Sequence, residues 1–125
     1  NRKTFELGDV TLLTSNPFAI IYLTSLEKNK SISESSRLLL TTIARARNTG
    51  MEYEYGDEVK LVKQGDGPVR VEPVNVTISF SDLQKGIVNV LDHDGLKKGK
   101  EIKFDKGTIN LSGTETKTIW YEIVR

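Results

Sequence analysis

The chain has 125 residues, no cysteine, and 18 basic against 17 acidic residues, which give a formal net charge of +1. This length suits one domain with a single core, and the lack of cysteine excludes disulfides and thiol chemistry. The charges are mixed along the chain, which argues against nucleic acid or an anionic membrane as a partner, and no apolar run is long enough to span a membrane. Because the first residue is not Met, we expect a segment of a larger protein.

The N-terminal part begins with a short lead-in, Phe5–Asp9, that ends in a Gly-Asp turn signal. The following residues, Val10–Thr14, are typical of a first strand, which Ser15-Asn16-Pro17 ends. Phe18–Leu26 is rich in Ile, Tyr, Leu and Thr on both faces. This pattern predicts a second strand that is covered on both sides.

The stretch Ser36–Met51 is compatible with two opposite structures. A helix is favoured by an apolar stripe of good helix formers, Leu38, Leu39, Leu40, Ile43, Ala44 and Ala46. A strand is favoured by the β-branched cluster Thr41-Thr42-Ile43 and by the alternation from Leu40 to Arg47. Because the rest of the chain consists of short strands and turns, we interpret the stretch as one long strand that ends at the turn Asn48-Thr49-Gly50.

Short strands also follow this turn. Met51–Tyr55 alternates, with Met51, Tyr53 and Tyr55 on one face and two glutamates on the other. Val59–Lys63 is a further short strand. A loop of Gly, Asp and Pro leads into Val69–Glu72, which Pro73 limits to a sheet edge or a bend.

The clearest strand follows Pro73, because Val74, Val76, Ile78 and Phe80 alternate with polar residues. Ile87–Leu91 is the next strand, and Asp92-His93-Asp94-Gly95 is a strong turn signal. The spacing of Lys100–Phe104 and Thr108–Leu111 around Asp105-Lys106-Gly107 predicts a hairpin.

The last strand, Thr118–Val124, alternates Ile119, Tyr121 and Ile123 with Trp120 and Glu122. If the aliphatic set packs inward, Trp120 points outward. We therefore predict an all-β chain of about eight to ten strands, folded as one antiparallel β-sandwich module over residues 1–125, of jelly-roll or immunoglobulin-like type.

Residues suited to catalysis are scarce. The single histidine, His93, lies in an Asp-His-Asp-Gly turn and is interpreted as a solvated turn residue. Asp92 and Asp94 offer oxygen ligands for Ca²⁺, but the loop lacks the acidic spacing and closing Glu of an EF-hand. We predict no catalytic residue and no cofactor, and the question of a structural metal stays open.

Two further patterns are candidates for anion binding. Gly65-x-Gly67-Pro68 is not a phosphate loop, because neither the glycine spacing nor a following helix is present. Arg37, Arg45 and Arg47 alternate with neutral residues on a chain of mixed charge. We interpret these arginines as a solvated strand face.

Aromatic residues are the candidate ligand contacts. An outward Trp120 offers a flat apolar platform on which the C–H face of a sugar ring stacks, and Tyr53 and Tyr55 are the next candidates. Two alternatives stay open: Trp120 packs against a neighbouring domain, or the strand has the opposite phase and Trp120 lies in the core.

Four segments resemble the C-terminal β-sandwich accessory domain that follows the TIM-barrel catalytic domain in large bacterial glycoside hydrolases of the cellulase and β-galactosidase-like kind. These segments are Ser35–Thr41, Ala44–Met51, Gly67–Val74 and Thr118–Ile123.

The resemblance implies a non-catalytic module in a secreted or cell-surface enzyme, with the catalytic residues on the attached barrel. Some such modules bind polysaccharide, and others only support the barrel. We therefore expect a carbohydrate-binding module that targets a glycoside hydrolase to plant polysaccharide. The alternative is a structural domain that packs on the barrel without a ligand of its own.

Overall fold

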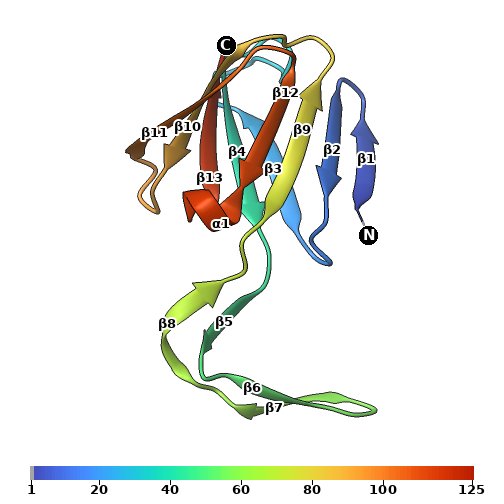
Figure 1. Cartoon of the computed structure of the whole chain (residues 1–125), viewed down its shortest axis with the longest axis vertical. Coiled ribbons are helices and arrows are strands. Elements are labelled where there is room, and N and C mark those ends of the chain that lie inside the picture. Colours follow the sequence, from blue (N-terminus) through green and yellow to red (C-terminus); the bar gives the residue numbers. More distant parts are fainter. Residues whose placement is uncertain (1) are drawn as a thin grey trace.

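The computed structural model describes residues 2–125, which form antiparallel β-strands and one short helix (Figure 1). The strands are β1 (Lys3–Leu7), β2 (Val10–Thr14), β3 (Ile20–Ser25), β4 (Arg37–Ile43), β5 (Ala46–Thr49), β6 (Glu52–Tyr55), β7 (Val59–Lys63), β8 (Asp66–Val71), β9 (Asn75–Phe80), β10 (Gly86–Leu91), β11 (Lys97–Phe104), β12 (Thr108–Ser112) and β13 (Trp120–Val124). The helix is α1 (Gly113–Thr116). The all-β antiparallel sandwich predicted from the sequence is confirmed, but the described residues form 13 strands and not the predicted eight to ten.

Two sheets form the sandwich. One has four strands in the order β1-β2-β9-β12, and the other has five in the order β11-β10-β13-β4-β3. The chain crosses from one sheet to the other between β2 and β3, β9 and β10, β11 and β12, and β12 and β13, whereas β1 and β2, β3 and β4, and β10 and β11 pair with each other within one sheet. Strands β1, β12, β11 and β3 form the four edges.

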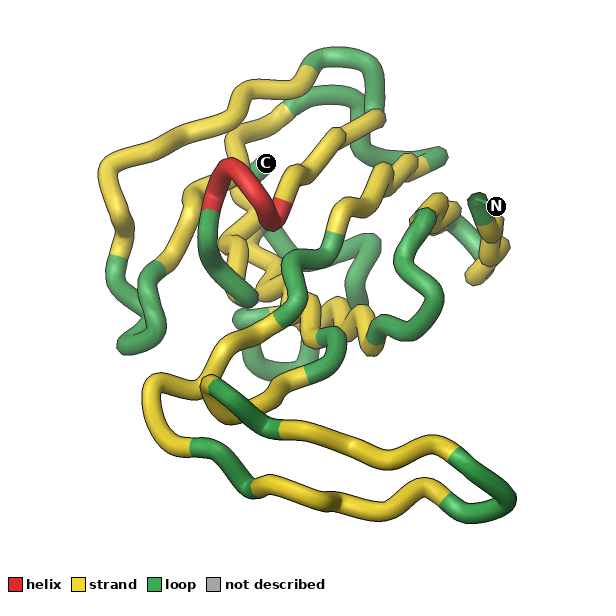
Figure 2. The backbone as a smooth tube through the Cα atoms, turned by 60° about the horizontal axis from the view of Figure 1, so that its bottom comes forward, coloured by secondary structure: helices red, strands yellow, loops and turns green. Residues whose placement is uncertain are grey.

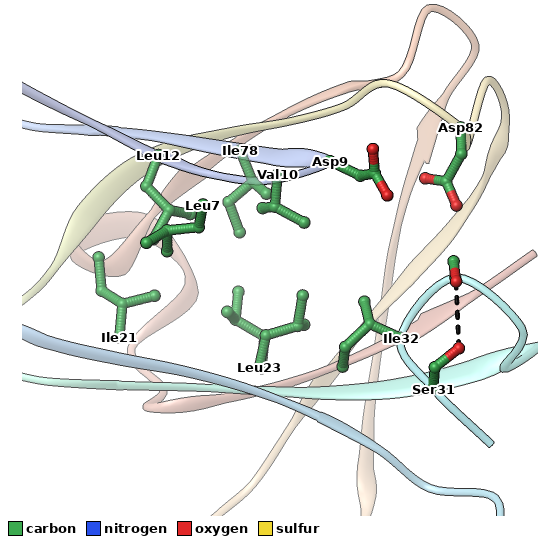
Figure 3. A pocket seen from close by; sticks show the side chains of 12 residues that line it. Leu7, Asp9, Val10, Leu12, Ile21, Leu23, Ser31, Ile32, Ile78 and Asp82 are labelled. Atoms are coloured by element: carbon green, nitrogen blue, oxygen red, sulfur yellow. Dashed lines mark hydrogen bonds between the residues drawn. The ribbon is translucent and has the colours of Figure 1, made fainter.

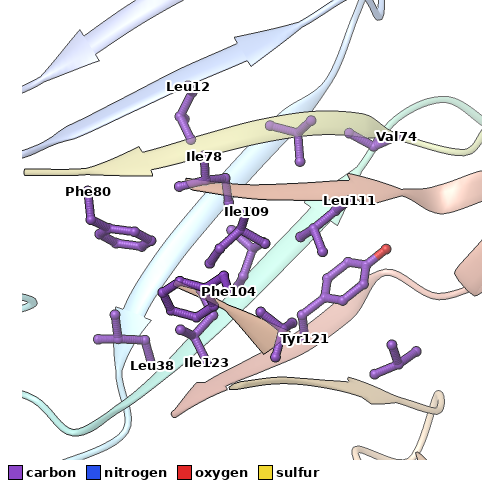
Figure 4. Close-up of a cluster of buried hydrophobic side chains, with 14 of the residues drawn as sticks. Leu12, Leu38, Val74, Ile78, Phe80, Phe104, Ile109, Leu111, Tyr121 and Ile123 are labelled. Atoms are coloured by element: carbon purple, nitrogen blue, oxygen red, sulfur yellow. The ribbon is translucent and has the colours of Figure 1, made fainter. Parts of the chain in front are cut away.

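The core lies between the two sheets (Figure 4). In the interior strands β4 and β9, alternate residues point into it, as the buried Leu38 and Leu40 of β4 and Val76 and Ile78 of β9 illustrate. The largest fully buried side chain is Tyr121. Tyr121 and Ile123 of β13 lie directly across from Leu40 and Leu38 of β4, so the side chains of Tyr121 and Ile123 point into the core.

The short helix α1 serves the buried phenol of Tyr121. Thr116 at the end of α1 lies 2.6 Å from the Tyr121 hydroxyl, and its own hydroxyl is 2.9 Å from the carbonyl oxygen of Ser112. Ser112 caps the helix by accepting a hydrogen bond from the N–H of Glu115. The polar end of a large core residue is thereby satisfied without water.

Strands β5 to β8 lie outside the sandwich and form an arm, residues 46–71, between β4 and β9 (Figures 1 and 2). Its proximal ribbon pairs β5 with β8, and its distal ribbon pairs β6 with β7. Each ribbon has two strands and no third to cover a face. Two-stranded ribbons are marginally stable in water, so the arm depends on side-chain contacts within it.

Several details of the expected strands are wrong. The stretch Ser36–Met51 is neither a helix nor one long strand, because the chain leaves the sandwich between Ile43 and Ala46. Asp105-Lys106-Gly107 does not close a hairpin, since β11 pairs with β10 and β12 pairs with β9. The turn crosses between the two sheets instead.

Three further differences concern exposure and short elements. The strand predicted within Phe18–Leu26 is an edge strand with exposed Ile20 and Tyr22, so it is not covered on both sides. The lead-in contains a strand, β1, all of whose residues are exposed. The helix α1 was not foreseen, because four residues show no helical period.

A matched pair of leucine variants tests which part of the molecule carries the stability. Leu40 is fully buried, and Leu61 on the distal ribbon is 52% exposed. We expect Leu40→Ala to lower the free energy of unfolding by about 2 to 5 kcal/mol. Leu61→Ala is expected to change it by less than about 0.5 kcal/mol, measured by urea denaturation. Equal losses would show that the arm and the sandwich share one core.

Candidate functional site

Trp120 lies on the outer face of the five-stranded sheet, as the outward phase of the last strand predicts. Its neighbour Tyr121 is fully buried, while Trp120 is half-buried. The alternative in which Trp120 lies in the core and Tyr121 is exposed is therefore wrong. Trp120 is directly opposite Thr41 of β4, whose side chain points to the same face.

A second aromatic residue completes a row across this face. Tyr22 of β3 is directly opposite Thr41 on its other side and is 64% exposed. Neighbouring strands are about 4.8 Å apart, so the Cα atoms of Tyr22 and Trp120 lie about 10 Å apart across β4. We call this row, Tyr22–Thr41–Trp120, the aromatic row. Sequence reasoning missed Tyr22, because only the sheet order shows that it shares a face with Trp120.

A polar cluster lies beside the aromatic row on the same face. Glu122 accepts hydrogen bonds from the Nε of Arg37 at 3.1 Å and from the Nδ2 of Asn89 at 2.9 Å. It also forms an ion pair with the Nη2 of Arg37. Glu122 and Asn89 are buried, whereas Arg37 is exposed. Within residues 2–125 the Oδ1 of Asn89 is buried and accepts no hydrogen bond.

These contacts set the ionisation of Glu122. Burial raises its pKa, but the hydrogen bonds from Arg37 and Asn89 outweigh burial and hold the pKa below its ordinary value of 4.5. The outer face therefore carries an ionised carboxylate, held by an exposed guanidinium, next to the aromatic row.

The other two predicted aromatics lie on the arm. Tyr53 and Tyr55 share a face of β6, with ring centroids 6.3 Å apart. The guanidinium carbon of Arg47 lies 4.9 Å from the centre of the Tyr53 ring, and its Nη2 donates to the Tyr55 hydroxyl at 3.3 Å. The hydrogen bond with Tyr55 is the main reason that the pKa of Arg47 is raised. The structure thus joins Tyr53 and Tyr55 to an arginine.

The three predicted aromatics do not converge on one site. Trp120 belongs to the sandwich, whereas Tyr53 and Tyr55 lie on the distal ribbon, which extends away from the sheets (Figure 1). The chain thus carries two separate aromatic sites.

The turn that holds the single histidine is exposed. Asp92 Oδ1 accepts hydrogen bonds from the backbone N–H groups of Asp94 and Leu96, each at 2.9 Å. The N–H of Leu96 is the largest cause of the lowered pKa of Asp92. Asp92 closes the turn, and His93 and Asp94 face solvent. Across residues 2–125 no group of three or more His, Cys, Asp or Glu side chains is arranged to hold a metal ion.

A cleft of about 420 Å³ opens between the two sheets on the side of β1 and β3 (Figure 3). Its walls are aliphatic, with Leu7, Leu12 and Ile21 among them, and Asp9 and Asp82 lie at one end. Neither tyrosine nor tryptophan lines it, so it lacks the platform that a sugar ring needs.

Comparison of the chain with family models, with curated proteins and with solved structures finds no match. In the described part of the chain, no helix is long and apolar enough to cross a membrane. The function must therefore be argued from the two aromatic sites.

The lowered pKa of Glu122 predicts a pH-dependent contribution to stability. A carboxyl whose pKa is lower in the folded state stabilises the fold above its unfolded pKa, and this stabilisation is lost as the pH falls. We expect Glu122→Gln to be less stable than the natural chain by about 1 to 3 kcal/mol at pH 7. The difference should shrink below pH 4.5, the ordinary value for this group.

Urea denaturation at a series of pH values measures this effect. The control is Glu101→Gln, which removes an exposed carboxyl from the strand beyond Asn89 and should change stability by less than about 0.5 kcal/mol. A Glu122→Gln deficit that stays constant from pH 7 to pH 3 would contradict the prediction.

Proposed function

We propose that this chain is a non-catalytic module that binds polysaccharide on the outer face of its five-stranded sheet. The observation that carries the proposal is the aromatic row, in which Tyr22 and Trp120 lie on one face on either side of Thr41. Aromatic rings offer flat apolar surfaces for the C–H faces of pyranose rings. The Thr41 hydroxyl between them and the exposed guanidinium of Arg37 offer partners for sugar hydroxyls.

The shape of this face suits a polymer better than a single sugar. Tyr22 and Trp120 lie on the two strands that flank β4, with Cα atoms about 10 Å apart. An oligosaccharide can contact both residues at once, whereas one pyranose ring cannot. The face is open at the β3 edge, where Ile20 and Tyr22 are exposed. A chain can therefore lie across the strands without an end having to enter a pocket.

The proposed role is to hold an attached enzyme on its substrate. The resemblance to accessory sandwiches of bacterial glycoside hydrolases supports this role, with catalysis on an attached barrel in a secreted or cell-surface protein. Plant polysaccharides are the proposed ligands, and the mixed charge of the chain gives no support for nucleic acid or membrane as a partner.

Removal of the indole tests the site. We expect Trp120→Ala to weaken glycan binding by about 1 to 3 kcal/mol, by analogy with the stacking of bases on aromatic side chains. Trp120→Phe keeps a ring and should retain part of the affinity. Affinity electrophoresis on xylan, glucan, mannan and galactan, followed by calorimetry on the best ligand, measures both variants. No retardation of the natural chain on any of these glycans would refute neutral-glycan binding at this face.

A second candidate function, docking on the attached catalytic domain, is favoured by the arm. Register places Tyr55 and Val59 opposite each other on the distal ribbon, and Val69 and Val71 share a face of the proximal ribbon. All four side chains are exposed, Tyr55 by 69%. Exposed apolar faces on a ribbon of two strands are typical of surfaces that a partner covers.

Hydrogen exchange distinguishes a docked arm from a free one. In the isolated chain we expect the amides of residues 46–71 to exchange much faster than those of β4 and β9, because the arm has no buried core. In the proposed larger polypeptide that includes the catalytic domain, docking should protect these amides from exchange. Arm amides that are already as protected as β9 in the isolated chain would argue against a partner.

A further inference from the structure

The bend between the two ribbons, which we call the elbow (residues 48–51 with 64 and 65), is a fixed structure. Asn48 Nδ2 donates to the carbonyl of Gln64 at 3.3 Å, and the N–H of Met51 donates to the carbonyl of Asn48 at 3.2 Å. Gly65 has a positive φ of 70°, and a Cβ there would lie 2.3 Å from the carbonyl oxygen of Thr49. Only glycine fits this crossing. The elbow therefore holds the two ribbons in one relative position.

The elbow places the basic face of the proximal ribbon next to the tyrosines of the distal ribbon. Arg45 immediately precedes β5 and is separated from Arg47 by Ala46, so Arg45 and Arg47 share a face of the proximal ribbon. Arg47 lies directly opposite Arg70. Arg45 and Glu72 form the next pair, because the N–H of Glu72 donates a hydrogen bond to the carbonyl oxygen of Arg45. Arg47 is at the same time held against Tyr53 and Tyr55.

This face carries more positive charge than its own residues neutralise. Like charges directly opposite each other on a ribbon are destabilising, yet Arg47 and Arg70 form such a pair. Within residues 2–125 no carboxylate oxygen lies within 4.0 Å of a side-chain nitrogen of Arg45, Arg47 or Arg70. Glu72 is the acidic residue beside them, and it lies across from Arg45 and not from the Arg47–Arg70 pair.

A groove of about 530 Å³ runs along this face. Its lining includes the three arginines, Glu72, and the apolar side chains of Met51 and Pro73. Three guanidinium groups and one carboxylate give it a net charge of +2. Guanidinium groups bind carboxylates through two parallel hydrogen bonds, which selects planar anions in fixed orientations.

We propose that this groove, lined by Arg45, Arg47 and Arg70, binds the carboxylates of an acidic polysaccharide, a chain of uronic acid residues. The inference rests on the proposed polysaccharide binding and adds a second contact region with its own ligand class. Arg70 and Arg45 take the carboxylates. Tyr53 and Tyr55 do not line the groove, but Arg47 holds both rings beside it, where the exposed Tyr55 offers a surface to a pyranose ring that extends past the groove. A groove that is open along the ribbon is accessible to a linear polyanion, whose successive carboxylates can reach more than one guanidinium group.

The test compares one sugar chain with and without its charge. The natural chain and its variants are run in affinity electrophoresis on polygalacturonate and on fully methyl-esterified polygalacturonate, and calorimetry with galacturonate oligomers gives the affinity. We expect binding of polygalacturonate, weakening as salt is raised, and weaker binding of the methyl ester. Arg70→Gln should weaken polygalacturonate binding about tenfold or more, since it removes hydrogen bonds between charged groups.

Lys60→Gln is the matched control. Lys60 lies on the opposite face of the distal ribbon, across from Glu54, and its replacement makes the same change in net charge on the same arm. We expect it to leave the affinity within about twofold of the natural value, because exposed charges off the site contribute little. Arg70 is chosen because its side chain donates no hydrogen bond within residues 2–125, so its loss leaves the elbow contacts in place.

Each other outcome overturns the inference in a distinguishable way. Equal binding of the ester and the acid, with no effect of Arg70→Gln, would leave polysaccharide binding standing and refute the acidic specificity. Equal weakening by Arg70→Gln and Lys60→Gln would show diffuse charge attraction without a site. Binding of polyglutamate with no binding of polygalacturonate would assign the groove to an acidic protein segment. Failure of all glycans, neutral and acidic, would remove both proposals.

Discussion

The strict alternation of β13 between the two faces of its sheet is the constraint on which the rest of the structure depends. Tyr121 and Ile123 enter the core across from Leu40 and Leu38, so Trp120 and Glu122 must face outward. A shift of one residue would turn the carboxylate and the indole into the apolar core between the sheets and turn Tyr121 and Ile123 out of it. The same alternation therefore fixes the core and places the aromatic row next to an ionised, hydrogen-bonded glutamate.

The sequence was sufficient for those features that depend on side-chain period within one strand. The half-buried strand after Pro73 and the inward phase of Tyr121 both follow from alternation alone. Alternation does not say which strands are neighbours. For that reason Tyr22 was missed as a partner of Trp120, and Asp105-Lys106-Gly107 was predicted to close a hairpin although it connects two sheets.

The arm was hidden from sequence reasoning for a related reason. Its strands have the same period, the same residue types and the same turn signals as strands of the sandwich, and only the lack of a third strand distinguishes them. The Arg47 contacts with Tyr53 and Tyr55 arise from the bend at the elbow, which no spacing along the chain encodes. A face of alternating arginines that suggested simple solvation becomes a groove once β8 adds Arg70 across from Arg47.

The roots of the arm have a mechanical consequence. The arm leaves the sandwich from β4, which belongs to the five-stranded sheet, and returns to β9, which belongs to the four-stranded sheet. Pairing of β5 with β8 therefore links the two layers at that end of the molecule by hydrogen bonds as well as by chain. A force on the arm is divided between β4 and β9, which are interior strands of their sheets. There it acts along the strands and is shared by the hydrogen bonds to both neighbours, so no edge strand is peeled away. The fold is thus anchored to resist tension that is applied along the arm.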